Sequence, residues 1–530
     1  MSKIVRQIKQ EFDKIPNKST QRAVIFQGGG PIGAYAAGVY AVLYHWVKKD
    51  IVGDENVFDI VAGTSAGAIN ASIIVSHVIH TENHDKLSRW KGSVQKVLDF
   101  WHHTSSSPDF TKWKPFFSYA WPFFNNEDAW ISVWDATRSD NKATGEAARR
   151  YYSAKEFLYS GAPRVFSHYP KENDERFYDN FWPVTNEWYR YNNDELKQSI
   201  RKYTHFPIRT KEKNEPRLLI VAVDVQEGEQ VTFDSHLSRV DFGYNEEGKT
   251  TAHIEYKHGL MAEHVMASAS VPVHYDYAIV PETFDYDKSE TEMESESTTL
   301  SMSNHRRFWD GGILSNTPLT EVIQAHRDSK DIPPAPLKVY IVDVWPSVKK
   351  YLVATDHDGV INRKNDLIYQ DKTFYEEKVT HLISDYKTLV DEIRKLVEQN
   401  NLQIDEILNR KTPKSRNRDG SERTYRKLID TVFDIDITRI ERTPDKNEIS
   451  FKWCDYSIES INCLIRQGVT DTLKALVKDF LQSNHNSKIV GEVELFINSV
   501  ECERQDKHLD KNHATLLMDE AKPLTLLNPC

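Results

Sequence analysis

The pentapeptide Gly63-Thr64-Ser65-Ala66-Gly67 has the GxSxG spacing of a nucleophile elbow. In such an elbow a serine occupies a strained turn, and small flanking residues let a strand and a helix pass closely. The apolar run Val57–Ala62 precedes the pentapeptide, and the small and apolar residues of Ala68–Ile79 follow it with a helix-length pattern. A helix N-terminus also favours negative charge that develops beside it. Ser65 is therefore predicted to be a catalytic nucleophile.

A second glycine-rich segment, Gly28-Gly29-Gly30-Pro31-Ile32-Gly33, follows the apolar run Arg22–Gln27. Its glycines formally match the GxGxxG dinucleotide fingerprint, which requires an acidic residue at the end of the next strand. That strand ends instead at Ala62, directly before the pentapeptide. We therefore favour an oxyanion hole, in which glycine N–H groups face the oxygen that becomes negative when Ser65 attacks a carbonyl.

Asp310 ends a short strand-like run and is followed by Gly311 and Gly312. A conventional triad requires a histidine held by an acid. None of the candidate histidines has a strand-end or loop signature that selects it: His253, His258, His264, His274, His326, His357 and His381. An ordinary aspartate is ionised at neutral pH and can take the serine proton without a relay. Asp310 is therefore predicted to be the base of a dyad with Ser65.

These three motifs, in this order, resemble the motif blocks of the patatin-like phospholipase family. Ala267–Pro272 resembles the block upstream of the family's catalytic aspartate, and Asn316–Leu319 resembles the segment that follows it. The resemblance covers residues 22–80 and 218–345. It implies an α/β fold with a three-layer α/β/α patatin-like sheet, and hydrolysis of lipid acyl esters with no metal and no cofactor.

The resemblance also assigns roles by position. It makes Ser65 the nucleophile, Asp310 the base, and Gly28, Gly29 and Gly30 the oxyanion hole. The supporting positions of the motifs are Gly33, Gly63, Gly67, Gly311 and Gly312. Many members of the family carry arginine or lysine just after the triple glycine, where this chain has Pro31-Ile32. The preference for a phosphate headgroup is therefore left open.

The composition of the chain changes along its length, which predicts how it is divided. Residues 1–100 and 217–350 read as two parts of one α/β core, with short apolar runs bounded by glycine as in a parallel sheet. Residues 101–216 are an aromatic-rich insertion, for which packing around a small core of its own is favoured and a lid over the sheet is the alternative, and 484–530 are a tail without periodicity. Residues 351–483 are a helical C-terminal region, in which Asp371–Asn400 has apolar residues at helix spacing and Arg410–Arg423 reads as a basic linker.

Charge and cysteine usage exclude several other classes of protein. Lys and Arg number 68 against 79 Asp and Glu, a net charge of −11 that argues against nucleic-acid binding. The charged N-terminal segment has no apolar core of a secretory signal, and the longest apolar stretch is too short to span a bilayer. The four cysteines form no CxxC pair, so neither a zinc site nor a disulfide framework is expected. A cytoplasmic protein with peripheral membrane contact fits best.

Several functions remain open at this level. The leading hypothesis is cleavage of lipid acyl esters, of the phospholipase A or lysophospholipase type, through an acyl-enzyme on Ser65. A hydrolase of non-lipid esters uses the same chemistry. A weakly active scaffold that binds lipid or protein through the Trp-rich insertion is a third reading. A nicotinamide-dependent oxidoreductase is supported by GxGxxG alone. The sequence leaves open the headgroup, the acyl position, the chain length and the oligomeric state.

Overall fold

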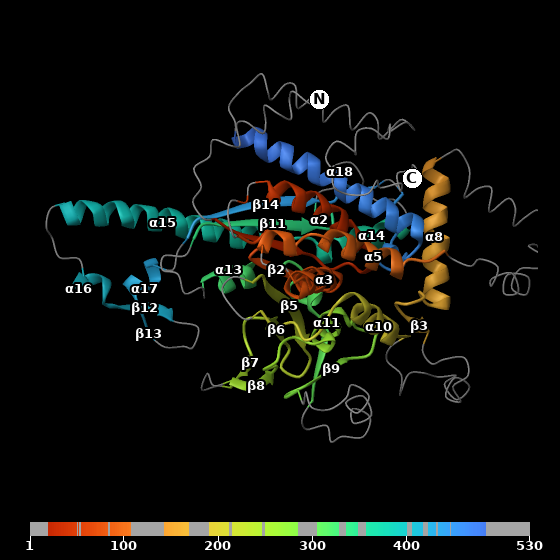
Figure 1. Cartoon of the computed structure of the whole chain (residues 1–530), viewed down its shortest axis with the longest axis horizontal. Coiled ribbons are helices and arrows are strands. Elements are labelled where there is room, and N and C mark those ends of the chain that lie inside the picture. The colour runs from red at the N-terminus through yellow and green to blue at the C-terminus, as the bar shows by residue number, and fades with distance from the viewer. Residues whose placement is uncertain are drawn as a thin grey trace, which may run out of the picture.

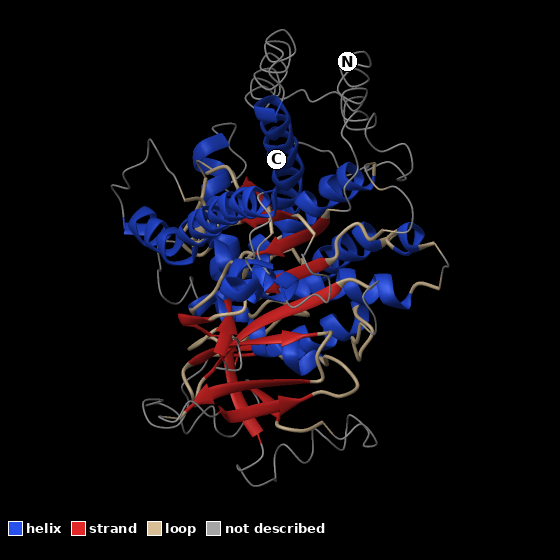
Figure 2. Ribbon diagram, turned by 90° about the vertical axis from the view of Figure 1, so that its left-hand side faces the viewer, coloured by secondary structure: helices blue, strands red, loops and turns tan. Residues whose placement is uncertain are grey.

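The computed structural model describes residues 20–49, 51, 55–82, 85–107, 142–168, 190–210, 215–245, 250–284, 305–327, 335–347, 357–399, 405–416, 422–430, 433–445 and 447–483. Much of the aromatic-rich insertion, the Ser-rich stretch before residue 305 and the tail lie outside these ranges. Within them the chain forms an eight-stranded mixed sheet with helices on both faces (Figures 1 and 2). The predicted α/β fold and the helical C-terminal region are confirmed.

The sheet has the strand order β14-β11-β1-β2-β5-β10-β9, and β6 pairs with β5. The parallel strands are β1 (Gln21–Phe26), β2 (Ile60–Thr64), β5 (Arg217–Asp224), β11 (Leu337–Asp343) and β14 (Ile435–Glu441). The antiparallel strands are β6 (Glu229–Asp234), β9 (Ala278–Pro281) and β10 (His305–Asp310). The parallel character expected of the first two strands therefore holds, and antiparallel strands complete the sheet beyond β5.

The two faces of β1 bury their side chains in different clusters, because successive residues of a strand point to opposite sides. Val24 and Phe26 belong to the larger core, which also includes the helices α2 and α3. Ala23 and Ile25 belong to a smaller cluster with Leu319 of α13 on the other side of the sheet. This alternation makes the three layers. The helices involved are α2 (Gly33–Lys48), α3 (Ala66–His80) and α13 (Leu319–Arg327).

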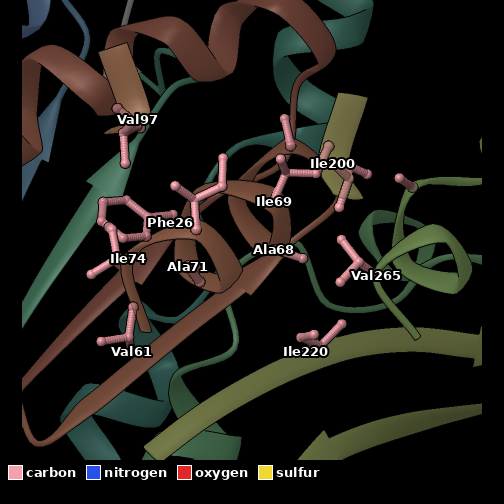
Figure 3. Close-up of a cluster of buried hydrophobic side chains, with 14 of the residues drawn as sticks. Phe26, Val61, Ala68, Ile69, Ala71, Ile74, Val97, Ile200, Ile220 and Val265 are labelled. Carbon is pink, nitrogen blue, oxygen red and sulfur yellow. The ribbon is translucent and has the colours of Figure 1, made fainter. Parts of the chain in front are cut away.

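Helix α3 lies at the centre of the larger core (Figure 3). Its small and apolar side chains, such as Ala71 and Ile74, meet residues of β1, β2 and β5. Further helices close around it: α5 (Ser93–Thr104), α10 (Asp194–Tyr203) and α11 (Ala262–Ala269). Because α3 is buried on nearly every side, it holds the residue that precedes it, Ser65, in a fixed position.

The C-terminal region is built into this core and supplies both a strand and a helix. Strand β14 pairs with β11 along seven residues, and α18 (Ile458–Ser483) packs along α2 (Figure 1). The two helices approach closely at two glycines. A Cβ atom on Gly38 would lie 2.0 Å from the carbonyl oxygen of Ile465, and one on Gly468 would lie 2.1 Å from that of Tyr35.

One correction to the sequence prediction concerns the basic stretch Arg410–Arg423. The basic stretch expected to be a linker forms a short antiparallel pair, β12 (Lys411–Arg416) and β13 (Glu422–Thr424). The remaining elements are η1 (Gly30–Ile32), α4 (Lys86–Arg89), α8 (Lys142–Ser160), β3 (Ser167–His168), β4 (Tyr191–Asn192), β7 (Arg239–Tyr244), β8 (Thr250–Glu255), η5 (Gly311–Ile313), α14 (His357–Tyr369), α15 (Phe374–Gln399), α16 (Asp405–Leu408), α17 (Tyr425–Asp430) and η6 (Lys452–Cys454). None of the helices in the described ranges has the length and apolar character needed to cross a bilayer. The division of the chain into five segments stays a prediction.

Replacing Gly468 by alanine tests the close crossing of α18 and α2. Alanine is about 1 kcal/mol better than glycine inside a helix, so an open site would gain stability. Here the added Cβ would lie 2.1 Å from the Tyr35 carbonyl oxygen, and overpacking of this kind costs about 1–3 kcal/mol. We expect Gly468→Ala to lower the melting temperature, measured by thermal unfolding. A higher melting temperature would show that the helices are further apart.

Candidate active site

Ser65 occupies the turn between β2 and α3, with backbone angles of φ 56° and ψ −125°. A positive φ is rare for a residue with a side chain and is typical of a nucleophile elbow. Gly63 and Gly67 are required because a side chain at either position would not fit. A Cβ atom on Gly63 would lie 2.3 Å from the carbonyl oxygen of Gly67, and one on Gly67 would lie 2.0 Å from that of Phe26. The strand, turn and helix context expected around Ser65 is therefore present.

Strand β5 brings Asp310 to Ser65. Val221 of β5 pairs with Thr64 at the end of β2, and the next residue, Ala222, pairs with Asp310 at the end of β10. The two strands thus meet end to end beside β5, and the residues at their tips lie together. The Ser65 side chain lies beside the Asp310 carboxylate and acts to lower its pKa.

Asp310 is held as a buried carboxylate. Gly312 donates its N–H to Asp310 Oδ1 at 2.7 Å, and the Asp310 N–H donates to the carbonyl oxygen of Ser270 at 2.9 Å. Burial raises the pKa of Asp310 to about 6, although Ser65 and the hydrogen bond from Gly312 act to lower it. The charged form is disfavoured when it loses water. At neutral pH the carboxylate is still mostly ionised and able to accept a proton.

The glycine loop lies against the nucleophile, but its first N–H group is already used. Gly28 donates its N–H to Asn316 Oδ1 at 2.9 Å, and its carbonyl oxygen accepts a hydrogen bond of 2.7 Å from Trp345 Nε1. No partner of the Gly29 or Gly30 N–H group is found among the residues that the structure describes. Of the three N–H groups predicted to form the oxyanion hole, that of Gly28 therefore holds the loop to Asn316, and those of Gly29 and Gly30 have no such partner within these residues.

Two further residues hold the site together, and sequence reasoning gave neither a role. The Ser65 N–H donates to Ser268 Oγ at 2.8 Å, and the Ser268 hydroxyl donates to the carbonyl oxygen of Val221 at 2.5 Å. Asn316 accepts a hydrogen bond from the Gly28 N–H through Oδ1, and its Nδ2 donates to the carbonyl oxygen of Tyr369 at 2.8 Å. Both residues lie in segments that resemble family motifs, so their positions were visible in the sequence although their contacts were not.

A cavity of about 220 Å³ opens onto Ser65, Asp310 and the glycine loop. Most of its walls are apolar or aromatic. The side nearest α3 includes Ile69, Phe100, Trp101 and Leu196, and the C-terminal region adds Tyr369, Trp453 and Tyr456. Such a lining suits an extended apolar group with its reactive carbon at Ser65.

Among the candidate histidines, only His274 lines this cavity. Its ring packs against Trp453 with centroids 4.4 Å apart, and burial, with the nearby charge of Arg190, lowers its pKa to about 4. His264 is fully buried in the core, and its Nδ1 accepts the Met261 N–H at 2.9 Å. No hydrogen bond between a histidine and Asp310 or Ser65 occurs within the described ranges. The acid that lies beside Ser65 in these ranges is Asp310.

The described residues contain no group of three or more His, Cys, Asp or Glu side chains arranged to hold a metal ion. The glycine loop that formally matches a dinucleotide fingerprint packs instead on the nucleophile. A Cβ atom on Gly28 would lie 2.6 Å from Ser65 Cβ.

An α/β sheet with a serine elbow below an apolar cavity defines a protein of the acyl-hydrolase class. The model of the patatin-like phospholipase family matches residues 24–323, more than half of the chain, and the protein belongs to this family. Among solved structures, the chain is similar to the crystal structure of VipD from Legionella pneumophila, at 11% identity and a TM-score of 0.28. That match covers 87% of this chain and 67% of VipD, and a likeness at this level carries no further weight. Comparison with curated proteins gives no match.

The burial of Asp310 generates a prediction for stability. The pKa of the folded state, about 6, lies above the ordinary value of 3.8, so the unfolded chain ionises more readily. Ionised Asp310 therefore destabilises the fold at pH 8 by about 3 kcal/mol, and this penalty shrinks as the pH falls through 6 towards 4. We expect Asp310→Asn to raise the melting temperature at pH 8 and to raise it by roughly half as much at pH 5. An equal change at both pH values would contradict the shifted pKa.

Proposed function

We propose that the protein hydrolyses lipid acyl esters, as a phospholipase A or lysophospholipase, through a Ser65–Asp310 dyad. The observation that carries the proposal is the position of the Ser65 side chain beside a buried Asp310 carboxylate, both of which line one apolar cavity. Membership of the patatin-like phospholipase family supports it. At the level of the family, the protein is a lipid acyl hydrolase.

In the first half of the reaction, Ser65 Oγ attacks the ester carbonyl while Asp310 takes the hydroxyl proton. The carbonyl oxygen becomes negative and faces the N–H groups of Gly29 and Gly30, which stabilise it without reorganisation. The tetrahedral intermediate then collapses, Asp310 returns the proton to the leaving alcohol, and the acyl group stays on Ser65.

In the second half, a water molecule takes the place of the alcohol. Asp310 accepts a proton from this water as it attacks the acyl-enzyme, and the same N–H groups face the second oxyanion. Collapse releases the fatty acid, and the proton on Asp310 returns to Ser65 Oγ. One carboxylate thus acts as base and acid in both halves, and its pKa near 6 suits it to exchange protons close to neutral pH.

The walls of the cavity support an acyl chain as the recognised group. Each methylene buried against residues such as Ile69, Phe100 and Trp101 contributes roughly 0.8 kcal/mol. The loop beside the serine carries buried Pro31 and Ile32 where many family members have a basic residue. We therefore propose that recognition depends on the acyl chain more than on a phosphate headgroup. A cytoplasmic location with peripheral membrane contact stays a prediction.

Removing either member of the dyad tests the proposal. We expect Ser65→Ala to abolish both ester hydrolysis and labelling by a fluorophosphonate probe. Asp310→Asn should lower kcat/KM by about 10²–10⁴-fold, the usual contribution of a general base. Activity is measured on lysophospholipid, phospholipid and a short water-soluble ester, so that a non-lipid esterase is recognised by its preference for the last.

A matched control is Asp241→Asn, which changes an exposed aspartate on β7. It should leave hydrolysis and labelling as in the wild type. Undiminished labelling of Ser65→Ala would refute the nucleophile assignment. A wild-type protein that binds lipid vesicles without hydrolysing any of the three esters would favour the scaffold reading.

The dyad also predicts a pH profile. Asp310 must be ionised to take the serine proton, and its pKa is raised to about 6. We expect kcat/KM to rise with pH, to be half-maximal near pH 6 and to level off above it, because the free enzyme's pKa governs this quantity. The fluorophosphonate labelling rate should follow the same curve. A profile that is flat from pH 5 to 8 would exclude Asp310 as the base.

A further inference from the structure

The long helix α15 carries an apolar seam that faces away from the rest of the protein. Its residues recur at alternating intervals of four and three, the heptad spacing of a coiled coil. In order they are Tyr375, Val379, Leu382, Tyr386, Leu389, Ile393 and Leu396. Six of these side chains are exposed, from 47% for Ile393 to 74% for Tyr375, and Val379 is half-buried.

The opposite side of α15 is the side that contacts the body of the protein. Glu377 pairs with Arg439 of β14, and the Ser384 hydroxyl donates to Asp434 Oδ1 at 2.9 Å. These two residues lie one heptad apart and about half a turn away from the seam. Figure 1 shows that α15 extends beyond the end of β14 and away from the sheet. Contact with the body therefore leaves the seam on the outside.

We propose that α15 pairs with the same helix of a second copy of this chain, as a parallel two-stranded coiled coil. The residue types at the two seam positions favour the parallel two-stranded arrangement. The first seam position, a, holds Val379, Tyr386 and Ile393, and the second, d, holds Tyr375, Leu382, Leu389 and Leu396. β-Branched residues at a with leucine at d favour parallel dimers.

The charges that flank the seam agree with the parallel arrangement. In a parallel pair, Asp385 faces Val390 of the partner subunit, and no like charges meet across the seam. In the antiparallel alignment with the greatest overlap, Asp385 would lie opposite Glu392 of the partner subunit, and this repulsion would occur twice by symmetry. Like charges in such contacts act against that alignment.

A lipid surface is the other occupant that an exposed apolar helix face could take. Interfacial helices usually carry lysine and arginine on the polar face, which attracts anionic lipid. In α15 the acidic residues outnumber the basic ones. A second copy of the chain is therefore favoured over a membrane, and a two-fold pairing of identical patches is the commonest form of assembly.

The first test compares two neighbouring substitutions in the full-length protein. Leu389→Glu places a charge in the seam, and Thr388→Glu places the same charge on an exposed residue beside it. We expect the wild type and Thr388→Glu to shift from monomer to dimer as concentration rises, measured by sedimentation equilibrium. Leu389→Glu should stay monomeric and keep wild-type fluorophosphonate labelling, which shows that it is folded.

The orientation is tested by disulfide formation, with Cys502 and Cys530 replaced by serine. In a parallel dimer, Leu396→Cys brings two cysteines together and cross-links on mild oxidation, whereas the matched Lys395→Cys on the outer face does not. Cross-linking of Lys395→Cys but not Leu396→Cys would overturn the parallel seam. A wild type that is monomeric at all concentrations, or a dimer that Leu389→Glu leaves intact, would overturn the proposal. The proposal would also be overturned if the protein is monomeric and floats with anionic lipid vesicles, and if Leu389→Glu abolishes this flotation.

Discussion

Strand β5 pairs along one edge with two strands that approach it from opposite ends. Val221 of β5 pairs with Thr64, the last residue of β2, and Ala222 pairs with Asp310, the last residue of β10. This register fixes the separation of Ser65 and Asp310, because each lies at or next to the end of its strand. A one-residue slip in either pairing would turn one side chain to the other face of the sheet. Ser268 adds a second tie, since its hydroxyl joins the Ser65 N–H to the carbonyl oxygen of Val221.

The same arrangement makes the site costly to the fold. Ser65 adopts a positive φ that costs of order 1–3 kcal/mol, and Asp310 is ionised where it has little water. The turn at Ser65 and the Asp310 carboxylate cannot easily relax to a less costly arrangement, because β5 and α3 beside them are buried almost throughout. A buried carboxylate with a raised pKa and a serine in a strained turn are features expected where a fold loses stability in favour of function.

Sequence reasoning can propose Ser65 and Asp310 as a pair because their motifs are local. A pentapeptide between a strand and a helix can be recognised along the chain. Asp310 is predicted as the base because no histidine has a strand-end or loop signature that selects it. The use of the Gly28 N–H could not be read in this way, because its acceptor, Asn316, is 288 residues away. The spacing along α15 was also visible as helical, but only the structure shows that the seam is exposed. A core helix and an unpaired coiled-coil helix have closely similar patterns.

The C-terminal region reaches the candidate active site although it lies beyond the residues that the family model matches. A Cβ atom on Gly30 would lie 2.6 Å from the carbonyl oxygen of Trp453, and Trp345 holds the carbonyl oxygen of Gly28. The loop proposed to bind the oxyanion is thus enclosed on its outer side by residues after 323. Helix α2 begins directly after this loop and packs along α18. The position of the Gly29 and Gly30 N–H groups therefore depends on contacts with α18 and η6 as well as on the strand that precedes the loop.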